Sequence, residues 1–140
     1  GLFEAGFLMG AHDALGGIGE TVGRVRVRVR AGGVMVIDDG YLVGETDDPG
    51  LARYRTLEET RRLLTSRGDE IVEERIAREE EQGEMEDRLT ARIRARAEGL
   101  AARRPELRGL LEEYVRTQER AGTELVRTLR YAMWVMRRGS

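Results

Sequence analysis

The sequence predicts a mainly α-helical protein with a small antiparallel β meander. We expect a short apolar N-terminal helix, two or three short strands, and two long helices that form a helical hairpin or a kinked coiled coil. Three observations predict this: apolar residues recur every three or four positions from Pro105 to Arg138, valine alternates with arginine from Arg24 to Arg30, and charged residues reach 36% against 5% aromatic residues. The expected segments are an arm with a hinge (1–20), the meander (21–45), a long charged helix (46–104) and an amphipathic helix (105–140).

The first segment reads as an apolar helix rich in glycine. Phe3 and Phe7 fall on one helical face, and Leu8 lies beside them. Each glycine inside an exposed helix costs about 1 kcal/mol relative to alanine. We therefore expect this helix to become ordered only when it packs against the chain's own core, a neighbouring subunit or lipid.

The same segment resembles a known class of membrane-active sequence. The opening Gly1-Leu2-Phe3, followed by interleaved alanine, glycine and phenylalanine, is similar to the fusion peptides of class I viral fusion proteins. Those proteins place an apolar, glycine-rich N-terminus ahead of a coiled coil. The resemblance implies a module that inserts into lipid.

A run of glycines from Gly16 to Glu20 predicts a flexible hinge. We expect it to precede a strand, whereas a dinucleotide fingerprint follows one, so the run is not predicted to bind a nucleotide. The chain contains no lysine, which also excludes a Walker A loop.

Alternation of valine and arginine predicts the first strand of the meander, and Val34–Ile37 and Tyr41–Val43 are expected to follow it. Its arginines would form a ridge that binds phosphates, acidic lipid heads or a carboxylate-rich helix; alternatively, the ridge is a solvated strand face that meets glutamates of a neighbour. The ridge consists of Arg24, Arg26, Arg28 and Arg30.

The long charged helix has two candidate starts. Asp48 can cap a helix with Pro49 at its first position, and Thr56 with Glu59 forms a capping box. We expect the helix to run to about residue 104, where Pro105 breaks it.

The C-terminal helix carries one long apolar stripe. A stripe this narrow predicts a second helix against it, either in a small bundle or in an oligomeric coil. The apolar patch from Tyr131 to Met136 is interpreted as the end of the coil packing on the N-terminal helix, or as a membrane-proximal or partner-docking end. The predicted oligomer or partner interface comprises Phe3, Phe7, Leu8, Leu107, Leu111, Tyr114, Leu125, Leu129, Met133, Trp134 and Met136.

Residues for recognisable chemistry are scarce. Cysteine is absent and His12 is the only histidine, so we predict no catalytic residue, no metal site and no cofactor. A net charge of −2 gives no general attraction to nucleic acid, and no apolar run approaches the ~20 residues of a membrane span.

These observations favour a non-enzymatic structural or assembly subunit of a filament, virion or phage. Its expected partners are copies of itself, another helical protein or, through the N-terminal segment, a membrane; nucleic acid is not expected. The alternatives are a membrane-active module of the fusion-peptide kind and a coiled-coil chaperone or scaffold that binds a protein partner.

Overall fold

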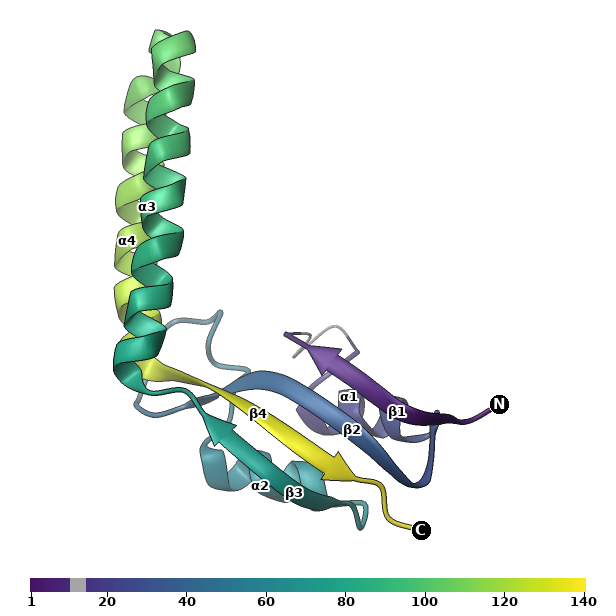
Figure 1. Cartoon of the computed structure of the whole chain (residues 1–140). Coiled ribbons are helices and arrows are strands. Elements are labelled where there is room, and N and C mark those ends of the chain that lie inside the picture. The colour runs from purple at the N-terminus through teal and green to yellow at the C-terminus, as the bar shows by residue number, and fades with distance from the viewer. Residues whose placement is uncertain (11–14) are drawn as a thin grey trace. The chain divides into compact units, whose positions relative to one another are not determined.

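A computed structural model describes residues 1–10 and 15–140, which divide into two compact units (Figure 1). Unit 1 comprises Gly1–Ala77 and Leu129–Ser140, and unit 2 comprises Arg78–Thr128. The elements of unit 1 are β1 (Phe3–Met9), α1 (Ile18–Arg26), β2 (Val29–Leu42), α2 (Leu57–Thr65), β3 (Glu70–Ile76) and β4 (Leu129–Arg137). Those of unit 2 are α3 (Glu79–Arg103), the 3₁₀ turn η1 (Pro105–Leu107) and α4 (Arg108–Thr128).

Unit 1 is built on a four-stranded mixed sheet with the order β1-β2-β4-β3. Strand β1 is parallel to β2, whereas β4 is antiparallel to both of its neighbours. The last strand in the sequence therefore lies in the middle of the sheet. Its register with β2 runs without interruption from the Val34–Arg137 pair to the Leu42–Leu129 pair.

Helix α1 makes the crossover that two parallel strands require. Ile18 and Val22 are 2% and 1% exposed, and Val25 packs beside them against the core. These three residues recur at steps of four and three, so the helix buries a single face.

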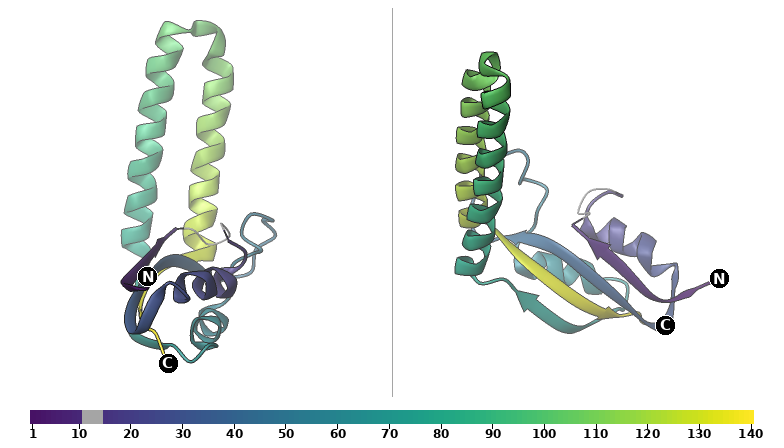
Figure 2. Two further views of the ribbon diagram at one scale, coloured as in Figure 1. Left: turned by 90° about the vertical axis from the view of Figure 1, so that its right-hand side faces the viewer. Right: turned by 45° about the horizontal axis from the view of Figure 1, so that its top comes forward.

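The core of unit 1 lies between one face of the sheet and the two helices α1 and α2, which are on the same side of it (Figures 1 and 2). Side chains of the central strands β2 and β4 fill it, because alternate residues of a strand point to the same face. The core consists of Leu8, Ile18, Val22, Val29, Met35, Ile37, Tyr41, Leu64, Ala132, Trp134 and Met136.

The second of the two predicted helix starts is confirmed in α2. The Thr56 side chain accepts a hydrogen bond from the backbone N–H of Glu59, and the Glu59 carboxylate accepts one from the N–H of Thr56. The helix stops at Thr65, and Gly68, with a φ of +80°, turns the chain into β3.

Unit 2 is a pair of antiparallel helices. Helix α3 ends at Arg103 and η1 begins at Pro105, as the proline predicts. Ala101 and Val115 are buried between the helices, and Arg94 forms an ion pair with Glu119 across them.

The predicted fold class is wrong, since the frame of the chain is a mixed sheet with helices and is neither mainly α nor a coiled coil. The expected N-terminal helix is strand β1. The expected meander strand Arg24–Arg30 is divided between the last turn of α1 and the start of β2, because the crossover needs a helix there. Residues 11–14, including His12, lie outside the described residues.

Both predicted long helices extend beyond the helices of the structure. The predicted helix 46–104 is interrupted by the loop after β2 and by strand β3. The predicted helix 105–140 ends at Thr128, and the stripe residues Leu129, Met133 and Met136 belong to β4. A strand that is apolar on both faces keeps apolar residues at helical spacings too, so the pattern alone could not separate the two.

Candidate functional site at the carboxyl edge of the sheet

Three strands of unit 1 end at the same edge of the sheet. Strands β1, β2 and β3 run in one direction, and β4 begins where they end. Two backbone hydrogen bonds hold this edge together: the Gly10 N–H donates to the Asp38 carbonyl over 2.8 Å, and the Ala77 N–H donates to the Tyr131 carbonyl over 2.9 Å. In open α/β sheets, ligands bind outside the carboxyl ends of the strands.

Two successive aspartates occupy the last part of β2. Because side chains alternate along a strand, they point to opposite faces of the sheet. Asp39 is 6% exposed and accepts a hydrogen bond from the Gly40 N–H over 2.8 Å. Asp38 is half-buried on the face away from α1 and α2, and burial first and the charge of Asp39 second raise the pKa of its carboxyl.

A partly exposed polar cluster lies behind the aspartates on the helix side. The Glu74 carboxylate accepts a hydrogen bond from the Arg61 Nε–H over 2.9 Å and one from the Trp134 indole N–H over 2.8 Å. These bonds, that of Arg61 foremost, lower the pKa of Glu74.

Tyr41 lies next to this cluster and is 8% exposed. Burial is the main cause that raises the pKa of its hydroxyl; the charge of Arg130, its register partner on β4, acts in the opposite direction. The hydrogen bonds of the cluster join α2, β3 and β4, and Tyr41 of β2 belongs to the same core as Trp134.

A groove follows the end of β2. The chain returns past this strand, where the Leu42 N–H donates to the Arg55 carbonyl over 2.8 Å, and the guanidinium of Arg53 lies 5.5 Å from the ring centre of Tyr54. The groove is lined by Leu42, Val43, Gly44, Glu45, Thr46, Asp47, Ala52, Tyr54, Arg55, Thr56 and Glu59.

The glycine run after β1 follows a strand and opens helix α1, so the stated reason for excluding a nucleotide fingerprint is wrong. In this structure the Glu20 side chain lies against the described part of the turn. Gly16 has a φ of +105°, and a Cβ placed there would lie 1.7 Å from an oxygen of the Glu20 carboxylate. The chain's own carboxylate therefore occupies the space beside this turn.

The predicted arginine ridge does not form on one strand face. Arg24 and Arg26 are in α1, Arg28 lies in the turn after it, and only Arg30 is in β2, where it pairs with the exposed Glu4 over 3.2 Å.

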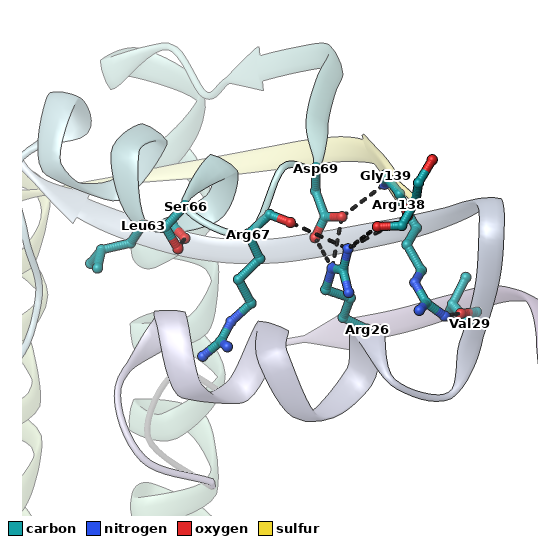
Figure 3. Close-up of polar contacts among 9 residues, drawn as sticks. Arg26, Val29, Leu63, Ser66, Arg67, Asp69, Arg138 and Gly139 are labelled. Atoms are coloured by element: carbon teal, nitrogen blue, oxygen red, sulfur yellow. Dashed lines mark hydrogen bonds and ion pairs between the residues drawn. The ribbon is translucent and has the colours of Figure 1, made fainter.

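Arg26 instead forms a clamp with a buried carboxylate (Figure 3). Its Nε–H donates to both oxygens of Asp69 over 2.9 and 3.0 Å, and Asp69 also accepts from the Gly139 N–H over 2.9 Å. The clamp ties the end of α1 to the turn before β3 and to the chain end after β4.

The predicted interface residues are spread over both units. Leu8, Leu129, Trp134 and Met136 are buried in unit 1 and cannot face a partner, because they have their neighbours within the chain. Phe3 and Phe7 are exposed on β1, and Met133 is half-buried on β4. In unit 2, Leu107, Leu111 and Leu125 are half-buried, and Tyr114 is exposed.

Within residues 1–10 and 15–140, no group of three or more metal-binding side chains comes together. None of the helices described is both long and apolar enough to cross a membrane.

No family of proteins matches the sequence, and no curated protein matches it either. Solved structures do match the fold. One is a methyltransferase dependent on S-adenosylmethionine from Thiobacillus denitrificans, in complex with S-adenosyl-L-homocysteine. The TM-score is 0.76 and the identity 15%, over 96% of this chain and 58% of that one. The chain has the fold of these methyltransferases.

Other matches show how broadly this methyltransferase fold is used. A cyclopropane synthase from Mycobacterium tuberculosis matches with a TM-score of 0.72 and 11% identity, over 98% of this chain and 56% of that chain. A [4+2]-cyclase matches with a TM-score of 0.67 and 17% identity, over 99% and 50%. The chain thus spans 58%, 56% and 50% of the lengths of these three structures. The methyltransferase fold by itself does not fix a reaction.

The methyltransferase fold overturns the predicted function. A non-enzymatic assembly subunit, built as a coiled coil of a filament or virion, was inferred from long helices, and those helices do not form the frame of the chain. The fusion-peptide alternative is overturned as well, because its segment is a strand of the sheet. Asp38 and Asp39 were not among the site residues predicted from the sequence. Their place directly after the apolar run Val34–Ile37 was the signal that could have located them at a strand end.

Proposed function

We propose that the chain is part of an enzyme that transfers a methyl group from S-adenosylmethionine, and that the sheet edge around Asp38 faces the methyl acceptor. The observation that carries this proposal is the likeness in fold, over 96% of the chain, to a methyltransferase that binds S-adenosyl-L-homocysteine. The position of the aspartates supports it, since this is the edge of an α/β sheet where ligands bind.

The described residues fit only part of such a site. S-adenosylmethionine would supply an electrophilic methyl group. Among the described residues of the turn before α1, the Glu20 carboxylate lies against Gly16. We therefore assign no cofactor contact to this turn. The role that we propose for residues 1–140 is limited to contact with the methyl acceptor.

Asp38 is the residue to which we assign chemistry. An amine or hydroxyl that takes up a methyl group must lose a proton, and a carboxylate within hydrogen-bond reach can accept it. The raised pKa of Asp38 makes its carboxylate a stronger base than an exposed aspartate. Asp39 and the Glu74 cluster lie on the opposite face of the sheet and do not reach the open face.

The test uses the whole protein that the gene encodes. S-adenosylhomocysteine binding is measured by calorimetry, and methyl transfer to small amines and alcohols is measured by release of S-adenosylhomocysteine. We expect Asp38→Asn to bind S-adenosylhomocysteine as the parent does and to transfer methyl about 100-fold more slowly, the usual loss when a general base is removed.

Asp48→Asn is the matched control. Asp48 is exposed and accepts a hydrogen bond from the Gly50 N–H over 2.7 Å within its own loop, so its replacement should leave transfer unchanged. If the whole protein bound neither S-adenosylmethionine nor S-adenosylhomocysteine, the proposed function would be wrong. Transfer at the parental rate by Asp38→Asn would instead remove Asp38 from the reaction.

A further inference from the structure

Strand β1 is an unprotected edge of the sheet. It stands at the end of the order β1-β2-β4-β3, so its outer side has no strand beside it among the described residues. Natural edge strands are usually protected by charges, proline or a cover. In β1 the only charged residue is Glu4, and Phe3, Phe7 and Met9 are 64%, 70% and 59% exposed.

The face of the sheet away from α1 and α2 is apolar next to this edge. Phe7 is in register with Val36, and Val36 with Val135, so the three form a row across β1, β2 and β4. Val34, two residues before Val36 in β2 and on the same face, is 38% exposed. At the other edge of the sheet, on β3, this face is charged and no longer apolar. Glu73 of β3 follows Val135 in the row and forms an ion pair with Arg75 over 3.3 Å.

Parallel strands are normally covered on both faces, because their crossover helices lie on either side of the sheet. Within unit 1, the parallel pair β1 and β2 has helices on one face only. The matched solved structure is also longer: this chain accounts for 58% of it. The apolar edge and the face without helices are both on the β1 side of the sheet.

We infer that β1 and the apolar row beside it bind a strand-and-helix segment of polypeptide outside residues 1–140. Its strand extends the sheet at the free edge of β1, and its helix lays an apolar face over Phe7, Val36 and Val135. The charged margin at β3 places the helix over β1 and β2. This inference rests on the fold and on the exposed surface and is independent of methyl transfer.

The chain contains no cysteine, so a single introduced thiol can report on this surface. We compare Phe7→Cys with the control Val27→Cys, whose native side chain is 59% exposed in the turn after α1. Each is made in residues 1–140 and in the whole protein that the gene encodes, with any cysteine outside 1–140 changed to serine. The rate of reaction with N-ethylmaleimide is measured.

In residues 1–140 both thiols should react at similar rates. In the whole protein, the Phe7→Cys thiol should react at least about tenfold more slowly, since a covered site reacts only when it opens locally, while the Val27→Cys thiol is unchanged. Equal rates for Phe7→Cys in the two forms would overturn the inference, as would a gene product with no residues beyond 1–140. Protection that rises with the concentration of residues 1–140 would overturn it in favour of a second copy.

Amide hydrogen exchange of the unsubstituted proteins gives a second readout. The β1 amides that point away from β2 should exchange rapidly in residues 1–140 and slowly in the whole protein, whereas those of the central strand β4 should be protected in both. Rapid exchange of β1 in the whole protein contradicts the inference even if a cysteine variant fails to fold.

Discussion

At the scale of single residues, unit 1 uses carboxylates in two ways. Glu74 and Asp69 each accept hydrogen bonds from an arginine and from a further N–H group, which joins separate elements of unit 1. Asp38 has no arginine among the causes of its pKa shift and is set apart by burial and by a second aspartate. Two of these carboxylates stabilise the frame, and the third is available for chemistry.

Removal of the Glu74 carboxylate should destabilise the protein. Trp134 is fully buried and its indole N–H donates to Glu74, so Glu74→Ala leaves a buried donor without its acceptor. We expect a loss of about 1–3 kcal/mol in the free energy of unfolding, measured by urea denaturation followed through the single tryptophan.

Glu73→Ala is the matched control. Glu73 is the neighbouring residue with a 58% exposed side chain, and its pair with Arg75 is worth about 0–1 kcal/mol.

The pKa of Glu74 is lowered in the folded protein. The stabilisation by its carboxylate is therefore present above the unfolded pKa and is lost as the pH falls through the folded pKa. The gap between parent and Glu74→Ala should therefore narrow in acid; a gap that stayed constant would contradict the assignment.

Asp38 should show the opposite pH dependence. Its pKa is raised, so the folded state holds a proton that the unfolded chain has released, and stability falls as the pH rises from the ordinary aspartate pKa of 3.8 through the folded value. Asp38→Asn removes this cost. We expect a higher melting temperature than the parent at pH 7 and none of this gain at pH 3, measured by scanning calorimetry; a lower melting temperature at pH 7 would show that the carboxylate is stabilising.

At the scale of elements, local signals and tertiary demands agree in α2 and disagree in α1 and β4. The Thr56 capping box starts α2 where the sequence places it, because the cap is made by residues three apart. Helix α1 forms because the parallel strands β1 and β2 need a crossover connection between them. The pairing of these two strands cannot be read from the local sequence of α1.

The cap itself can be tested by substitution. Thr56→Ala removes the acceptor of the Glu59 N–H and should cost about 1 kcal/mol of stability, within the range measured for N-caps. Thr65→Ala is the control in the same helix, because the Thr65 hydroxyl only donates to the Arg61 carbonyl at the other end. Equal losses in the two variants, measured by thermal unfolding, would contradict a specific role for the cap.

At the scale of the whole molecule, unit 2 is an insertion between two adjacent strands. The chain leaves β3 after Ile76 and re-enters β4 at Leu129, and Ile76 is in register with Ala132. The two strands would make an ordinary hairpin if a short loop joined them.

Replacement of residues 78–128 by the loop Gly-Asn-Gly-Ser should therefore leave unit 1 folded. The core of unit 1 draws no residue from unit 2, so we expect a single cooperative unfolding transition and the near-ultraviolet circular dichroism of a buried tryptophan. A variant without tertiary dichroism would show that β3 and β4 depend on the helices.

The sequence by itself determined the local features of this protein. The capping box at Thr56, the break at Pro105 and the helical character of 79–103 and 108–128 follow from residues within a few positions of one another. Only the tertiary structure decided that 3–9, 70–76 and 129–137 are strands and that Asp38 lies at a shared carboxyl edge. Strand pairing joins residues as distant in the sequence as Val34 and Arg137. An apolar run becomes a strand only when it pairs with such a partner, and the run itself does not indicate which partner that is.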